Sequence, residues 1–442
     1  MAYTETTRQS WGSRMKGSFG GILFGFILFI GSFVLLWWNE GRAVERTKSL
    51  EEGQGVVMHV GNEQVDPANE GKLVSFSGWA DTKETLTDPQ FGIAEQAIKF
   101  ERSVEMYQWK EKSSSKKEKK FGGAEETVTT YTYEKGWSSS LINSDNFKDP
   151  AAPSRNRNPQ AIPYERLSLQ ASNVMLGAFQ LPRAVIDRIG NRQKLTPSEE
   201  SARKIENAHI AGSYLYVGND PGTPAVGDLR ISFAVVKPQD ISIIARQLGS
   251  SLDAYPTEAG GELLMVSNGI VASDKMFEGA HSANTFITWL LRLAGFLMMM
   301  FSLRMITGPL AVLGDVVPFI GRIVRGITGF VAGLIAFALS LVTISLAWIW
   351  YRPILGISML AVGIGTILLI RYMKREKEET KRDEFTFPDK ESAVEVIDDT
   401  IRPANATDDL AAQLRKLKAL KDEGILTQEE FDTEKKQLLD EK

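Results

Sequence analysis

Few side chains in this sequence have types and spacings suited to chemistry. The chain has no cysteine, which excludes disulfides, thiolate metal sites and cysteine nucleophiles. Its three histidines, His59, His209 and His281, are far apart in sequence, so a histidine-based zinc motif is improbable. No HExxH, GxSxG or phosphate-binding GxxxxGK[ST] motif is present. We therefore predict no catalytic residue, no cofactor and no metal site, and expect a protein that is not an enzyme.

Paired carboxylates are the remaining candidates for acid–base chemistry. Glu125 and Glu126, and likewise Glu199 and Glu200, lie in polar segments. Solvated surface is the favoured interpretation of both pairs. A hydrolase on the extracytoplasmic side therefore ranks lowest among the functions considered.

Arg292 is the one charge well inside a hydrophobic run, Phe286–Met305. A charge at such a position can be a functional intramembrane group. Alternatively, its long side chain can extend to the membrane–water interface near the end of the helix. We favour the second interpretation.

The element that positions most of the chain is the apolar stretch at residues 17–38. Between Phe19 and Trp38 it carries no charge, which is enough to cross a bilayer as a helix, and two tryptophans close it. A cleaved signal peptide is the alternative, but no small-residue cleavage site follows. Small residues at Gly17, Gly21 and Gly25 form a stripe along which a second helix could pack closely.

Residues 285–372 contain three further apolar runs, Phe286–Met305, Gly326–Trp350 and Pro353–Tyr372. The connection at residues 308–321 is apolar but interrupted by prolines, which predicts an interfacial or re-entrant segment. Basic residues flank the spans on one side: Arg8, Arg14, Lys16, Arg322, Arg325, Arg371, Lys374, Arg375 and Lys377. Their distribution predicts four spans, with both termini, including a tail at residues 1–16, in the cytoplasm.

Residues 39–284 have the composition of a soluble α+β domain. Short β-rich runs separated by turn sequences predict a strand-dominated fold with antiparallel pairing. Lys110–Glu126 is rich in lysine, serine and glutamate and predicts a mobile loop. It lacks interleaved aromatic residues, and the chain has a net charge of −4, so we predict no nucleic-acid partner.

The C-terminal segment begins with a charged linker at residues 373–405 and ends in a predicted helical hairpin at residues 406–442. Apolar residues at helical spacing form its expected interface: Leu410, Leu414, Leu417, Leu420, Ile425, Leu426, Phe431 and Leu438. Gly424 would end the first helix, and Thr427 with Glu430 would cap the second. The segment resembles the short C-terminal domain known as SHOCT. A hairpin this small has little core, so we expect it to associate with a copy of itself or another partner.

The longer part contains several distinctive motifs, including Asn39-Glu40-Gly41-Arg42, the block from Arg102 through Glu105 and Tyr107 to Trp109, and the run from Trp289 to Gly295. These motifs resemble those of the transmembrane protein 43 (LUMA) family. The resemblance covers about residues 20–372 in the same order. It implies four spans, a large lumenal domain and a role in organising membrane protein complexes, notably at the inner nuclear membrane. The SHOCT-like tail departs from the animal pattern and is typical of bacterial proteins.

These observations predict a non-enzymatic membrane scaffold that binds lipids, associates with itself and has unidentified protein partners. A channel or transporter subunit built on the second to fourth helices is the alternative. The expected location is a bacterial inner membrane with a periplasmic domain, or an inner nuclear or endoplasmic reticulum membrane if the source is eukaryotic.

Overall fold

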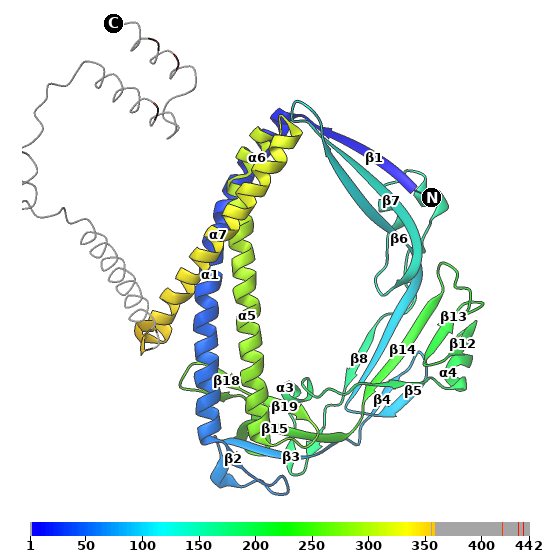
Figure 1. Ribbon diagram of the computed structural model, residues 1–442. Coiled ribbons are helices and arrows are strands. Elements are labelled where there is room, and N and C mark those ends of the chain that lie inside the picture. Colours follow the sequence, from blue (N-terminus) through cyan, green and yellow to red (C-terminus); the bar gives the residue numbers. More distant parts are fainter. Residues whose placement is uncertain (1, 355, 359–417, 419–431, 433–435, 437–442) are drawn as a thin grey trace, which may run out of the picture. The chain divides into compact units, whose positions relative to one another are not determined.

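The computed structural model describes residues 2–354, 356–358, 418, 432 and 436 (Figure 1). The chain divides into two compact units, residues 1–360 and residues 361–442. Most of the predicted fourth span and nearly all of the predicted C-terminal hairpin fall outside the described residues. Lys418, Asp432 and Lys436 are described there, and all three are helical.

The first unit contains mixed helices and strands, as the sequence predicts. Its α-helices are α1 (Trp11–Val56), α2 (Ala152–Arg155), α3 (Arg183–Ile186), α4 (Glu199–Arg203), α5 (Ser273–Ile306), α6 (Gly308–Gly314) and α7 (Pro318–Tyr351). Among the described residues, three helices are long and apolar enough to cross a membrane: α1, α5, and α7 from Gly326 onward. The predicted interfacial connection consists of the short helix α6 and the first turns of α7.

The predicted boundary at residue 38 required α1 to end with its apolar run. The helix is instead 46 residues long and continues beyond that run. The side chain of Ser10 caps its first turn by accepting a hydrogen bond from the backbone N–H of Ser13 at 3.2 Å. No proline interrupts the charged stretch after Trp38, and alanine, glutamate, arginine, lysine and leucine there favour a helix. The helix therefore continues as a single rod to Val56.

Helices α1, α5 and α7 pack against one another around Leu36, Met299 and Ala336. A Cβ atom on Gly295 of α5 would lie 2.5 Å from Leu36 Cδ2, so the glycine permits the close approach of the two helices. Most other apolar side chains of these helices face outward, as expected of surfaces that contact lipid.

The strands form two larger sheets and two small ones. The strands are β1 (Ala2–Gln9), β2 (Met58–His59), β3 (Leu73–Asp81), β4 (Thr85–Asp88), β5 (Ile93–Gln96), β6 (Lys99–Lys119), β7 (Glu125–Ser138), β8 (Leu167–Gln170), β9 (Met175–Leu176), β10 (Phe179–Gln180), β11 (Gln193–Leu195), β12 (Ala208–Ala211), β13 (Tyr214–Val217), β14 (Leu229–Val236), β15 (Gln239–Leu248), β16 (Ser251–Asp253), β17 (Tyr255–Pro256), β18 (Glu262–Leu263) and β19 (Met265–Asn268). The 8-stranded sheet has the order β1-β7-β6-β14-β13-β12; in addition, β8 pairs with β6 and β11 pairs with β14. The 7-stranded sheet has the order β10-β9-β3-β15-β16; in addition, β19 pairs with β15 and β2 pairs with β3. The pairings are antiparallel, as predicted, except that β2 and β3 run parallel.

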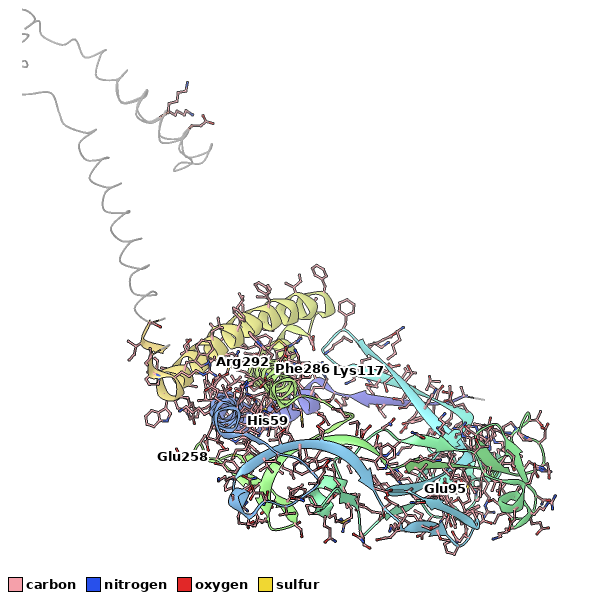
Figure 2. All side chains as sticks on the ribbon, turned by 90° about the horizontal axis from the view of Figure 1, so that it is seen from below. His59, Glu95, Lys117, Glu258, Phe286 and Arg292 are labelled. Atoms are coloured by element: carbon pink, nitrogen blue, oxygen red, sulfur yellow. The ribbon has the colours of Figure 1, made fainter. Side chains whose placement is uncertain are left out.

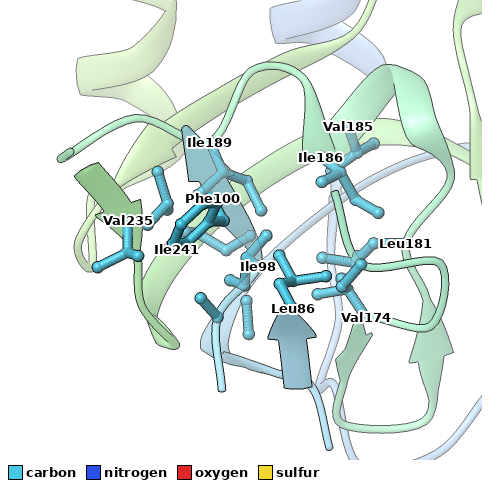
Figure 3. Packing of buried hydrophobic residues seen from close by; sticks show 14 of the residues in the cluster. Leu86, Ile98, Phe100, Val174, Leu181, Val185, Ile186, Ile189, Val235 and Ile241 are labelled. Atoms are coloured by element: carbon cyan, nitrogen blue, oxygen red, sulfur yellow. The ribbon is translucent and has the colours of Figure 1, made fainter. Parts of the chain in front are cut away.

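The main core lies between elements of these two sheets (Figure 3). Strand β14 shows the expected alternation, with Leu229, Ile231, Phe233 and Val235 buried. Phe100 of β6 and Ile241 of β15 belong to the same buried cluster.

A second core joins the end of α1 to the domain. Leu50 of α1, Leu73 of β3, Leu263 of β18 and Phe277 of α5 are all fully or almost fully buried there. A Cβ atom on Gly53 would lie only 2.2 Å from Leu263 Cδ1. The domain is therefore packed directly onto the helix whose other half carries the apolar run.

The prediction of a mobile loop at Lys110–Glu126 is wrong, because these residues form the end of a hairpin. Strand β6, 21 residues long, pairs with β7 as far as Lys119, which lies opposite Glu125. The turn contains Gly122 and Gly123 at positive φ. Composition indicated correctly that these residues form no hydrophobic core. A strand pair can nevertheless form from such a sequence, through backbone hydrogen bonds and opposite charges across the strands, such as Lys112 and Glu134.

Part of the segment at residues 1–16, expected as a tail without structure, also belongs to this sheet, and Trp11 begins α1. Residues 2–9 form β1, which pairs with β7 along its length, Thr4 lying opposite Thr130. Threonine-rich sequence favours an extended strand. This pairing places the N-terminal residues beside the domain that the sequence prediction assigns to the opposite side of the membrane.

Candidate functional site: a polar cluster between three helices

The main polar site of the bundle is an ion pair between α1 and α5. Arg292 Nε donates to Glu40 Oε1 at 2.7 Å, and Arg292 Nη2 donates to Glu40 Oε2 at 2.8 Å. Trp348 of α7 adds its indole N–H to Glu40 Oε2 at 2.8 Å. All three helices therefore contribute to one charged group.

The Glu40–Arg292 pair is largely buried and lies beside two aromatic rings. The side chains of Arg292 and Glu40 are 15% and 3% exposed. The Arg292 guanidinium carbon lies 4.8 Å from the centre of the Trp289 ring and 5.6 Å from that of the Trp348 ring, within the range of cation–π interactions. The sequence placed Arg292 alone in its hydrophobic run, whereas the structure gives it a partner. Figure 2 shows Arg292 among the helices.

A hydrogen-bonded layer continues from this pair along α1 and α5. Arg42 donates through Nη1 to Asn284 Oδ1 and through Nη2 to Thr288 Oγ1, both at 2.9 Å. Asn39 Nδ2 donates to the carbonyl of Thr288 at 3.1 Å, and Asn284 Nδ2 donates to the carbonyl of Ala43 at 3.0 Å. Side chains of each helix thus bond the backbone of the other, which fixes their register.

Gly41, the remaining residue of the Asn39–Arg42 motif, serves the contact with α7. A Cβ atom at this position would lie 2.7 Å from Cζ of Tyr351. The aromatic ring therefore rests on the backbone of α1, and only glycine leaves room for it. Each residue of the motif has a structural role in joining the three helices.

A separate charged cluster lies at the opposite end of α1. Asp315 accepts from Arg14 and from Lys119, and the same lysine lies 3.1 Å from Glu125. Trp11 Nε1 donates to the carbonyl of Val312 at 3.1 Å. The cluster connects α1 and the segment after α6 to the tip of the β6–β7 hairpin.

The Arg102–Trp109 block of β6 has partners inside the domain. Arg102 binds Asp88 at 2.8 Å and is almost fully buried, while Glu105 accepts from Arg230 at 2.7 Å. The ring of Tyr107 lies 5.2 Å from that of Trp137. The backbone N–H of Trp109 donates to Asn158 Oδ1 at 2.7 Å. These contacts agree with the structural interpretation of the block and leave its use as a partner surface untested.

Tyr133 of β7 makes a further, partly buried interaction. Its hydroxyl donates to Glu111 Oε2 at 2.8 Å. Burial of the phenol, with a smaller contribution from Glu111, raises the pKa of Tyr133 to about 12.

The glycine stripe of α1 contacts α5 only toward one end. A Cβ atom on Gly25 would lie 3.1 Å from the carbonyl oxygen of Ser302, and one on Gly21 would lie 3.9 Å from Met305. At Gly17 it would meet no atom within 4 Å. The predicted hairpin-interface residues, from Leu410 to Leu438, lie outside the described residues.

Sequence reasoning did not recognise the polar cluster, although its members were visible. Glu40 and Arg42 entered only as motif residues, and Asn284, Thr288 and Trp348 were not proposed. The available signal was spacing: Asn284, Thr288 and Arg292 recur every four residues and therefore share one face of a helix. The second signal was the opposite charges of Glu40 and Arg292, each near one end of an apolar run.

Two family models match separate parts of this chain. The family model described as "Transmembrane protein 43" matches residues 106–353, and that of the "Short C-terminal domain" matches residues 412–439. "Transmembrane protein 43" of Homo sapiens is 33% identical over 373 residues, covering 81% of this chain and 91% of that protein. The "Transmembrane protein 43 homolog" of Drosophila melanogaster is 32% identical over 354 residues, covering 77% of this chain and 91% of that protein. No solved structure matches the chain. The chain is therefore a membrane protein that belongs to the transmembrane protein 43 family.

Proposed function

We propose that this protein is a non-enzymatic membrane scaffold that holds its strand-rich domain at a fixed position relative to the bilayer. The observation that carries the proposal is the continuity of α1, which runs from the apolar bundle into the second core around Leu50 and Leu263. Around it, the Glu40–Arg292 pair fixes the three helices to one another. A domain attached in this way presents its surface to partners in one orientation.

Association with other copies is the second part of the proposal. The match to a short C-terminal domain supports it, because a two-helix unit of that size needs a partner to complete a core. The apolar outer faces of α1, α5 and α7 offer additional surface within the membrane.

For location we propose a bacterial inner membrane with the domain in the periplasm, on the strength of the C-terminal match and the distribution of basic residues. The inner nuclear membrane is the alternative for a eukaryotic source. An orientation with residues 1–16 in the cytoplasm requires β1 to be separated from β7, and Arg14 and Asp315 from the tip of the β6–β7 hairpin, because these contacts cannot extend through about 30 Å of hydrocarbon. One molecule can therefore have β1 paired with β7 or residues 1–16 in the cytoplasm, but not both.

A channel or transporter is the competing proposal, and Arg292 is its main support in the sequence. In the structure the charge of Arg292 is matched by Glu40 within the bundle. Conductance in reconstituted bilayers that disappears in the Arg292→Ala variant would favour the channel over the scaffold.

Chemical crosslinking in native membranes tests the scaffold. The expected result is a defined oligomer together with reproducible protein partners. A variant truncated after residue 405 is the matched comparison, and we expect it to lose the higher species. A full-length chain that is strictly monomeric and recovers no partner would contradict the proposal.

A further inference from the structure

A cavity of about 730 Å³ opens beside α1 where the apolar run ends. It lies between the end of the bundle and the β17–β18 turn of the domain. Its lining combines aromatic rings with charges of both signs, including Trp38, Trp350, Tyr351, Lys48, Glu45 and Glu258. Glu258, labelled in Figure 2, lies beside α1, since its backbone N–H donates to Glu52 at 2.9 Å.

Three charged side chains of this cavity have no side-chain partners among the described residues. No ion pair or side-chain hydrogen bond engages Lys48 Nζ or the carboxylates of Glu45 and Glu258 there. Arg42 also lines the cavity, but its Nη atoms donate to Asn284 and Thr288 and its Nε is buried. Charges of both signs are therefore available to a ligand.

The position of the cavity identifies the kind of ligand. Trp38 ends the uncharged run of α1, and Trp350 and Tyr351 end α7. Tryptophan and tyrosine favour the level of lipid headgroups. Trp350 and Ile354, on the outer side, are 73% and 84% exposed and provide an apolar surface beside which acyl chains can lie.

We propose that this cavity binds the headgroup of a zwitterionic phospholipid, one that carries both a phosphate and an ammonium group. Lys48 supplies the donor to the phosphate, and the nearby positive charge of Arg42 adds electrostatic attraction. Glu45 and Glu258 neutralise the ammonium, and the aromatic rings attract it through their π faces. An anionic headgroup without an ammonium group would satisfy the basic side chains but leave both carboxylates facing negative charge. The site depends on the membrane location of the protein and not on the scaffold proposal.

Native mass spectrometry of the full-length protein tests this assignment. The protein is exchanged into detergent containing equal amounts of phosphatidylethanolamine, phosphatidylcholine and phosphatidylglycerol, and the retained lipids are compared. We expect preferential retention of the two zwitterionic lipids. The Lys48→Gln variant should weaken their retention by about tenfold, the effect of losing one charge-assisted hydrogen bond.

The double variant Glu45→Gln/Glu258→Gln separates the two halves of the headgroup. It should remove the preference over phosphatidylglycerol while retaining binding of phosphate-containing lipids. The matched controls are Lys194→Gln and Glu199→Gln/Glu206→Gln, which alter exposed charges away from the cavity and should leave retention unchanged. Equal retention of all three lipids, a preference for phosphatidylglycerol in the unaltered protein, or retention of none would overturn the proposal.

Discussion

Breaking the Glu40–Arg292 pair is the most direct test of how the bundle is held together. Arg292→Met leaves a Glu40 carboxylate that is only 3% exposed, and Glu40→Gln leaves a guanidinium that is 15% exposed. Removing one partner of a buried ion pair costs about 3–5 kcal/mol in unfolding free energy. Loss of the contacts with Trp289 and Trp348 adds up to about 1–2 kcal/mol for Arg292→Met. We therefore expect both variants to be destabilised, Arg292→Met more strongly.

The combined variant Glu40→Leu/Arg292→Met provides the sharper measurement. Replacing both charges with apolar groups removes the desolvation cost of each, so its unfolding free energy should lie within about 1–2 kcal/mol of the original value. Thermal unfolding of the purified protein, followed by intrinsic tryptophan fluorescence, measures all three variants. At about 2 °C per kcal/mol, Glu40→Gln should lower the thermal midpoint by about 6–10 °C and Arg292→Met by about 8–14 °C.

The control lies on the same helix. Lys275 and Glu278 of α5 form an exposed pair at 2.6 Å, with side chains 72% and 65% exposed. Lys275→Met should cost less than about 1 kcal/mol. Single variants at the buried pair that behave like this control, or a combined variant as unstable as the singles, would refute the reasoning.

Three further predictions concern other parts of the chain. Thr4→Cys with Thr130→Cys should form a disulfide in the purified protein, because opposed residues of antiparallel strands lie about 4.5–5.5 Å apart and the chain has no other cysteine. Gly25→Ala should lower the thermal midpoint of unfolding, whereas Gly17→Ala should leave it unchanged or raise it, since a Cβ meets Ser302 only in the first case. The pKa of Tyr133 is raised from 10.0 to about 12, so the stabilisation by its neutral phenol, complete below pH 10, should be lost as the pH rises toward about 12. Chemical unfolding at a series of pH values measures this loss of stability. In the Tyr133→Phe variant the part that arises from titration of Tyr133 should be absent.

The disulfide experiment also distinguishes the two arrangements of the N-terminal strand. Ser114→Cys with Thr130→Cys joins two residues paired inside the hairpin and should crosslink in every state of the protein. Crosslinking of Thr4 with Thr130 in intact membranes would contradict the assignment of residues 1–16 and the domain to opposite sides. Crosslinking only after extraction into detergent would agree with separation of β1 in the bilayer.

Local pattern in the sequence was sufficient for the apolar helices and for the strand-rich, antiparallel character of the domain. Strand β14 (Leu229–Val236) is one such β-rich run, and its alternation agrees with its buried face. The apolar runs of α1, α5 and α7 were recognised because lipid requires long uncharged helices. The end of α1 was missed, since the change from apolar to charged residues marks a change of solvent and not the end of a helix.

The features that could not be predicted from the sequence depend on contacts between residues far apart in the chain. Glu40 and Arg292 are 252 positions apart, and nothing local identifies one as the partner of the other. Strand β1 was missed for the same reason: its partner β7 lies more than one hundred residues away, and threonine-rich polar sequence is equally compatible with a disordered tail. The Lys110–Glu126 hairpin was judged by its lack of a core, although strand pairing satisfies a backbone without one.

The uninterrupted α1 rod has a mechanical consequence. About 18 residues separate Trp38 from Val56, a rise of about 27 Å. If the bundle tilts by about 10° to match a thinner bilayer, a rigid lever of that length displaces its far end sideways by about 5 Å. The protein would thus convert bilayer thickness into movement of the sheets attached at Leu50 and Gly53.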